Sequence, residues 1–234
     1  MRGTIFLLIW AWSADALCAP HEHKPSVVLA PGYAPLSFTP PEPGSYALPA
    51  IGSAADGAVL DSDGNSAQLH DFLGGKPTVL SFIFTTCDDV NGCPLATYVM
   101  RSVQDALQAD PSTADKARLV SFSFDPVFDT PDVIDAYGSQ FRAGDFDWQF
   151  LTTEGATTLD PILSAYGQWV IRDYNENGEY KGTMSHILRV FLIDESRQIR
   201  NIYSTSFLHA DTVANDVRSL LIEAAAQPSA DTGS

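Results

Sequence analysis

The stretch that decides the fold is residues 79–100, with the sequence VLSFIFTTCDDVNGCPLATYVM. Its opening apolar run, residues 79–84, predicts a buried strand. A polar loop with Cys87 and Cys93 follows. Pro94 is typical of the first turn of a helix, because its missing N–H needs no partner there. The predicted order of strand, dithiol loop and helix places both thiols at the sheet edge where α/β proteins usually bind their ligands.

The composition is that of one globular domain with extensions. The chain has 234 residues, of which 45% are hydrophobic, so it has the material for a real core. Its formal net charge is -16, with only 13 Lys and Arg residues. Nucleic-acid binding relies on cationic side chains that contact phosphates, so we expect no nucleic-acid partner.

The N-terminus has the layout of a secretory signal peptide, predicted over residues 1–19. Arg2 precedes an apolar run over residues 5–12, and small residues follow it. A membrane span takes roughly 20 residues, so a short uncleaved anchor is the less favoured alternative. We therefore expect a periplasmic or otherwise exported protein. Once Cys18 is removed with the signal, the mature chain keeps Cys87 and Cys93 in an oxidising compartment, where a lone pair favours redox or metal chemistry.

Three further segments follow the signal peptide. Residues 20–45 are rich in proline and predict an extended linker, residues 46–226 the folded domain, and residues 227–234 a disordered tail. His21 and His23 in the linker could form a loose copper or zinc site. We expect them instead to be polar residues that follow the cleavage site, since so short a motif often matches by accident.

Strands and helices alternate along the domain. A hairpin follows them, and a C-terminal helix closes the chain. We expect strands over residues 46–51, 58–60, 79–84, 117–124, 147–152, 187–193 and 198–203, and helices over residues 67–73, 94–107, 131–141, 159–166 and 211–226. Residues 172–182 are expected to be a polar loop. This order predicts an α/β fold, a thioredoxin-like three-layer sandwich with a central mixed sheet and an N-terminal strand pair.

The dithiol loop permits two kinds of chemistry. Cys93 lies at a helix N-terminus, which favours its thiolate, whereas Asp88 and Asp89 disfavour further negative charge, so the direction of the pKa shift stays open. The Asn91-Gly92 dipeptide allows a tight turn. The loop can therefore close a disulfide or bring two thiolates onto one metal ion.

His186 is the candidate for a third ligand. Two thiolates and an imidazole make a soft site that favours Cu(I) and can hold Cu(II). His186 lies just before the strand predicted from residue 187, whose start should face the dithiol loop. The alternative is a structural histidine. We expect the nearby Met184 to pack in the core.

Three separated motifs resemble the Sco (SenC/PrrC) copper proteins of cytochrome oxidase assembly. The loop from Phe84 to Pro94 is similar to that family's F-T-x-C-P-D-V-C-P sequence. Residues 123–131, SFDPVFDTP, are similar to its S-x-D-P-x-x-D-T segment, and Ser185-His186 is similar to its D-H-[ST] strand start. The motifs follow in family order and, with their flanking elements, cover about residues 46–223.

The resemblance implies a thioredoxin-like fold with Cys87, Cys93 and His186 as copper ligands. It also implies a metallochaperone that delivers copper to the binuclear copper subunit of a respiratory oxidase, or reduces the cysteines of that subunit beforehand. The chain would then meet the membrane only through its partner. Asp125 matches an acidic residue near the family's site, although a polar strand end before a proline turn is an equal alternative.

Several positions depart from the family pattern and keep other functions open. Asn91-Gly92 is an insertion between the cysteines, Asp88 replaces a proline and Ser185 an aspartate. A longer loop can weaken copper binding and leave a thiol-disulfide oxidoreductase, served by a thiol reductant, in which Cys87 or Cys93 is the catalytic thiol. A redox sensor or peroxidase needs the dithiol alone. The proline that thioredoxin-type catalysts place opposite the dithiol is absent, which favours the copper chaperone over an enzyme.

Overall fold

The computed structural model describes residues 35–226. The predicted signal peptide, His21, His23 and the tail over residues 227–234 lie outside these residues. Within the described part, no helix is long and apolar enough to cross a membrane.

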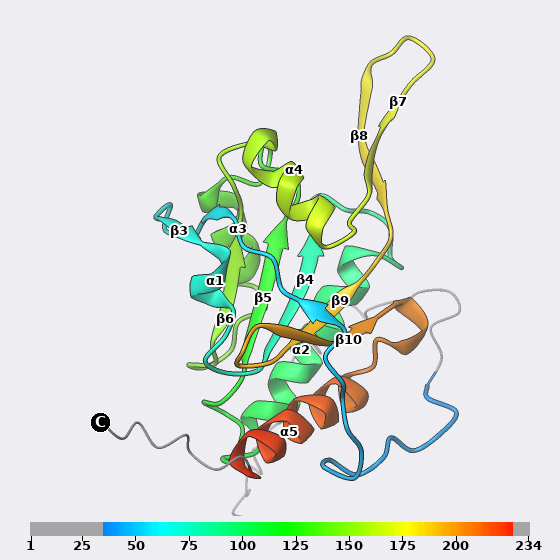
Figure 1. The fold of residues 1–234 in the computed structure, drawn as a ribbon. Helices are drawn as coiled ribbons and strands as arrows, with labels where there is room; N and C mark the ends of the chain where they lie inside the picture. Colours follow the sequence, from blue (N-terminus) through cyan, green and yellow to red (C-terminus); the bar gives the residue numbers. More distant parts are fainter. Residues whose placement is uncertain (1–34, 227–234) are drawn as a thin grey trace, which may run out of the picture.

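A six-stranded mixed sheet forms the centre of the fold (Figure 1). Its strand order is β1-β10-β9-β4-β5-β6. Strands β4, β5 and β6 are parallel, and β9 runs antiparallel to β4. The bounds are β1 Gly52–Ser53, β4 Thr78–Ile83, β5 Arg118–Ser123, β6 Trp148–Leu151, β9 Val190–Ile193 and β10 Gln198–Tyr203. Every residue of β4 is buried, as expected for a central strand covered on both faces.

Helices cover both faces of the sheet and make the three layers that the sequence predicts. One core contains Val79, Leu119 and Leu192 from the sheet, packed against helices α2, α3 and α5. The other contains Leu80 and Val120, packed against α1 and α4. The bounds are α1 Leu69–Phe72, α2 Cys93–Gln108, α3 Pro131–Gly138, α4 Ala156–Ala165 and α5 Ala210–Ala226. Adjacent strand residues enter opposite cores because side chains alternate across a sheet.

The N-terminal strand pair differs in its members from the prediction. Residues 46–51 form no strand. Strand β2, Ala58–Leu60, pairs instead with β3, Ser66–Gln68. Asp61 closes the turn between them, because its carboxylate accepts hydrogen bonds from the backbone N–H groups of Asp63 and Asn65. Strand β3 is too short and polar to stand out in the sequence.

Helix α4 begins earlier than the sequence suggests. The prediction started it at residue 159, near Pro161, whereas the structure starts it at Ala156 and places that proline inside the helix. Three apolar side chains of the helix are buried against the sheet: Leu159, Ile162 and Leu163. The stabilisation from this packing outweighs the cost of the backbone hydrogen bond that Pro161 cannot donate. The helix ends at Ala165, one residue before the predicted end, and Gly167, where φ is 59°, follows the C-cap residue Tyr166.

Residues 172–182 are not a loop but most of a β-hairpin. Strand β7, Val170–Tyr174, pairs with β8, Tyr180–His186, and the hairpin projects from the body of the molecule (Figure 1). Its turn is fixed by Asn175, whose side-chain oxygen accepts hydrogen bonds from the N–H groups of Asn177 and Glu179. His186 therefore ends a hairpin strand, and the next strand of the central sheet, β9, starts only at Val190.

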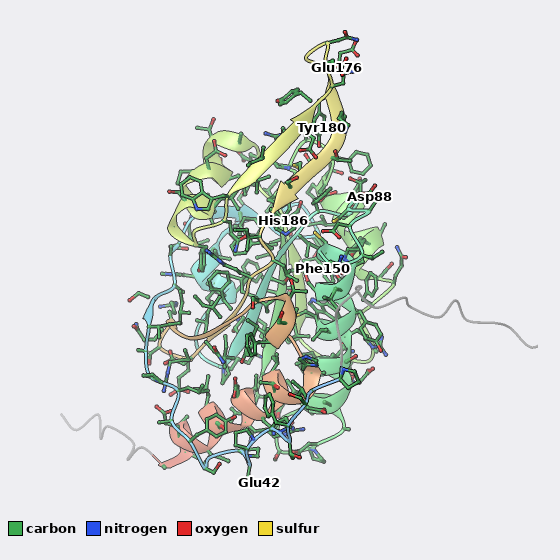
Figure 2. The ribbon with its side chains drawn as sticks, turned by 90° about the vertical axis from the view of Figure 1, so that its right-hand side faces the viewer. Glu42, Asp88, Phe150, Glu176, Tyr180 and His186 are labelled. Atoms are coloured by element: carbon green, nitrogen blue, oxygen red, sulfur yellow. The ribbon has the colours of Figure 1, made fainter. Side chains whose placement is uncertain are left out.

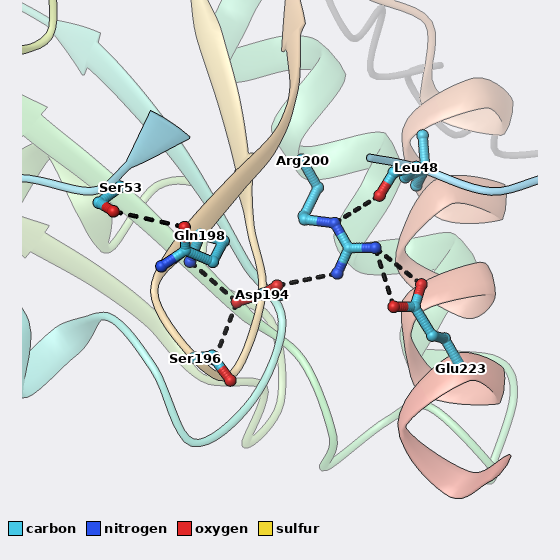
Figure 3. A network of polar contacts seen from close by, with 7 residues as sticks. All are labelled: Leu48, Ser53, Asp194, Ser196, Gln198, Arg200 and Glu223. Carbon is cyan, nitrogen blue, oxygen red and sulfur yellow. Dashed lines mark hydrogen bonds and ion pairs between the residues drawn. The ribbon is translucent and has the colours of Figure 1, made fainter. Parts of the chain in front are cut away.

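Arg200, in β10, connects the β9–β10 hairpin to helix α5 (Figure 3). Its guanidinium contacts the carboxylates of Asp194 and Glu223, both at 2.8 Å, and donates to the carbonyl oxygen of Leu48 at 2.5 Å. The segment before β1 is held in a second place, where the Tyr46 hydroxyl donates to Asp216 at 2.6 Å. The described end of the predicted linker, residues 35–45, has no helix or strand.

The first prediction concerns Gly138 at the end of α3. A Cβ atom there would lie 2.6 Å from the ring of Phe150, which is fully buried and cannot move aside. We expect Gly138→Ala to lower the free energy of unfolding by about 1–3 kcal/mol, measured by urea denaturation. Gly52→Ala is the control, because a Cβ atom at that position would have no neighbouring atom within 4 Å. Equal stabilities of the two variants would contradict the packing described here.

Candidate functional site

The two cysteines meet at the carboxyl end of β4. Cys87 lies in the loop that leaves β4, and Cys93 is the first residue of α2. The Asn91-Gly92 insertion forms a turn in which Gly92 N–H donates to the carbonyl oxygen of Asp89 at 2.8 Å. A Cβ atom on Gly92 would lie 3.5 Å from Cys87 Sγ. The turn thus folds back onto the dithiol, and the two thiols stay within hydrogen-bonding reach.

The two thiols have opposite acid–base character. The hydrogen bond from Cys93 lowers the pKa of Cys87 to about 7, although partial burial opposes this. Burial raises the pKa of Cys93, and its contact with the Cys87 sulfur raises it further. The sequence suggested that the helix N-terminus would favour the Cys93 thiolate and so lower its pKa. In the structure, the effect of burial on this pKa is larger and has the opposite direction. Near neutral pH, Cys87 is therefore the thiol that ionises, and Cys93 keeps its proton and donates it to the Cys87 sulfur.

His186 lies at the same end of the fold but against an aromatic ring. Its imidazole centroid is 4.7 Å from that of Phe124, the residue that follows β5. Burial lowers the pKa of His186, so the ring is neutral at neutral pH. Its Nε2 atom is buried and has no hydrogen-bond partner among the described residues. A neutral imidazole with a free nitrogen is the form that binds a metal ion.

The structure does not bring the three predicted ligands into one ready site. Among residues 35–226, no three His, Cys, Asp or Glu side chains are close enough to hold a metal ion. The thiols of Cys87 and Cys93 are together, whereas His186 rests on Phe124. Figure 2 shows His186 at the base of the hairpin and Asp88 in the neighbouring dithiol loop. A metal ion held by all three would need the imidazole and the two sulfurs to move closer together.

Other residues around the site have plainer roles. Met184 is buried in the core, as expected. Asp125 is largely buried, and its backbone carbonyl accepts hydrogen bonds from the N–H groups of Phe128 and Asp129, as in a strand end followed by a turn. Its resemblance to an acidic residue of a metal site stays a prediction.

Sequence reasoning missed the group that fixes the dithiol loop. Asp129 is fully buried, and its carboxylate accepts hydrogen bonds from Thr85 and Ser123. Burial raises its pKa, and these hydrogen bonds offset part of that effect. All three residues belong to the motifs quoted above, but spacing alone gave no sign that they meet.

Fold and site together define a thioredoxin-like protein with a dithiol where the first parallel strand meets its helix. The SCO1/SenC family model matches residues 55–222, so the chain belongs to the SCO1/SenC family. The motif resemblance is confirmed.

Solved structures show the same fold. Arabidopsis thaliana ScoI with copper bound has a TM-score of 0.62 and 20% identity, covering 74% of this chain and 99% of that one. Bradyrhizobium japonicum ScoI with copper bound has a TM-score of 0.59 and 25% identity, covering 73% and 99%. The predicted thioredoxin-like sandwich is therefore confirmed.

The sequence match to a curated relative is shorter. The SCO1 protein homolog of Bacillus subtilis (strain 168) is 32% identical over 92 residues, which is 39% of this chain and 45% of that protein. The chain thus matches less than half the length of this relative.

The unequal thiols give the second prediction. In the reduced protein at pH 7, iodoacetamide should modify Cys87 well before Cys93, because Cys87 is the more exposed and more acidic thiol. Its rate should rise as the pH passes about 7. In Cys93→Ala the hydrogen bond that lowers the Cys87 pKa is lost, so the midpoint should move to higher pH. Mass spectrometry of the modified peptides measures both effects, and equal modification of the two cysteines would contradict the assignment.

Proposed function

We propose that this chain is an exported copper-binding metallochaperone. The observation that carries the proposal is the Cys87 and Cys93 pair at the same end of the fold as His186, whose buried Nε2 has no hydrogen-bond partner among the described residues. Thiolate and imidazole suit copper, and soft sulfur ligands favour Cu(I). Two solved relatives, from Arabidopsis and Bradyrhizobium, hold copper. Export is supported by the signal-like residues 1–19.

The side chains suggest an order of events for copper as cargo. Cys87 is the thiol most ready to take the ion, since its pKa of about 7 leaves much of it as thiolate at neutral pH. Cys93 must lose its proton to become a ligand. His186 is already neutral, but it must move closer to the sulfurs to share the ion with them. Release to a partner would reverse these steps.

The proposed recipient is the copper-binding subunit of a respiratory oxidase. One solved relative, BsSco, is described as a member of the Sco family of cytochrome c oxidase assembly proteins. The loops and the hairpin at the dithiol end also expose large apolar side chains, which is typical of a protein-binding surface. These side chains are Val90, Val127, Phe128, Trp169, Ile171, Tyr174, Tyr180 and Ile187.

Thiol-disulfide exchange is the second candidate, favoured by the acidity of Cys87 and by the separation of His186 from the thiols. The Cys87 thiolate would attack a partner disulfide and form a mixed disulfide, releasing one partner thiolate. Cys93, after losing its proton, would then attack the Cys87 sulfur and release the second partner thiolate. The chain ends as a disulfide, and the partner gains two electrons and two thiols.

The third prediction separates the two functions. The reduced domain should bind one copper ion with a sulfur-to-copper charge-transfer band, and His186→Ala should bind it at least tenfold more weakly. His70→Ala is the matched control, because His70 is a partly buried histidine on α1 that contacts Ala54 and Asp56. Titration against a competing chelator measures both affinities.

Two results would count against the chaperone. Loss of copper from the wild-type protein to a moderate chelator would contradict the proposed chaperone function. Equal affinities of wild type and His186→Ala would remove His186 as a ligand. Exchange with glutathione disulfide that survives His186→Ala would then favour the oxidoreductase.

A further inference from the structure

Asp129 is a buried carboxylate that neither proposed function uses. It has no exposed surface and lies in the segment between β5 and α3. No Lys, Arg or His forms an ion pair with it among the described residues. A buried charge without a counter-ion is costly, so it must be held by hydrogen bonds. The hydrogen-bond partners of the Asp129 carboxylate show which segments it connects.

All its side-chain hydrogen bonds go to the ends of two parallel strands. Thr85, just after β4, donates its backbone N–H to Asp129 at 3.0 Å and its hydroxyl to the other carboxylate oxygen. Ser123, the last residue of β5, donates its hydroxyl at 2.5 Å. The Asp129 carboxylate therefore bridges the two strand ends. Thr85 stands only two positions before Cys87 in the chain.

The backbone around Asp129 is held in place on both sides. The N–H of Asp129 donates to the carbonyl oxygen of Asp125 at 2.8 Å. The next residue, Thr130, is the N-cap of α3. By contrast, the dithiol loop carries exposed residues at Thr86 and over residues 88–90. The bonds from Thr85 to Asp129 thus fix the near end of a loop whose middle is open to solvent.

We propose that Asp129 is a positioning residue for the dithiol, whose carboxylate holds the Cys87 segment so that Cys87 Sγ stays within bonding reach of the buried Cys93. The proposal rests on the use of this cysteine pair, which both functions above share, and it needs no copper. Cys93 is fixed by helix α2, so the position of Cys87 decides how often the sulfurs meet.

This role has a consequence for thiol exchange. In exchange with glutathione, the reduced chain and one glutathione disulfide give the intramolecular disulfide and two reduced glutathiones. The equilibrium constant measures the effective concentration of one thiol at the other. A freer loop lowers that concentration, and the equilibrium constant falls with it.

The experiment compares two pairs of variants. Asp129→Asn should lower the glutathione equilibrium constant about tenfold. Asp216→Asn is its control, because Asp216 is a buried carboxylate bonded to Tyr46, Asn201 and Tyr203 and belongs to the α5 side of the fold.

The second pair guards against a variant that does not fold. Thr85→Val removes only the hydroxyl bond and should lower the constant several-fold. Thr86→Val is its control, because Thr86 is exposed and its hydroxyl has no hydrogen bond among the described residues. Circular dichroism establishes that each variant is folded under the assay conditions.

Two results would overturn the proposal. One is a folded Asp129→Asn or Thr85→Val whose equilibrium constant stays within twofold of the wild type. The other is an equal shift in Asp216→Asn or Thr86→Val, which would indicate general destabilisation. Copper affinity, measured separately on the wild type, tests the chaperone function and leaves this result unaffected.

Discussion

The parallel pairing of β4 with β5 is the constraint on which the rest of the site depends. Because parallel strands end at the same edge, the residues that leave β4 lie next to those that leave β5. The first set includes Thr85 and Cys87, and the second includes Ser123 and Asp129. Residues about forty positions apart in the sequence are thereby brought within hydrogen-bonding distance. The antiparallel β9 completes the sheet on the other side of β4.

The sequence predicted elements well where burial and local geometry agree. Strand β4 is buried at every position, and Pro94 marks the start of α2, so both were found nearly to the residue. The β7–β8 hairpin was missed because it has no buried face along most of its length, and its hydrophobicity follows no strand period. Pro161 misplaced the start of α4, because the packing of a helix on a sheet cannot be deduced from local propensity.

The sequence predicted that the two cysteines meet, but it did not predict the surroundings of the candidate site. Cys87 and Cys93 meet as the loop sequence suggested. The acidity of the two thiols depends on how deeply each is buried, and a sequence does not give depth. For the same reason, the contact of His186 with Phe124 could not be foreseen. The contact joins the last residue of β8 to the residue that follows β5.

The hairpin that carries His186 is outside the central sheet, and most of its side chains face solvent. Substitutions along it remove little buried apolar area, so the domain can tolerate them without loss of its core. The thiols, in contrast, are built into the junction of β4 and α2. The thiols thus belong to the tightly packed interior, whereas His186 belongs to a hairpin that the core does not need for its packing. The hairpin can therefore change in sequence while the two sulfurs keep their place at the junction of β4 and α2.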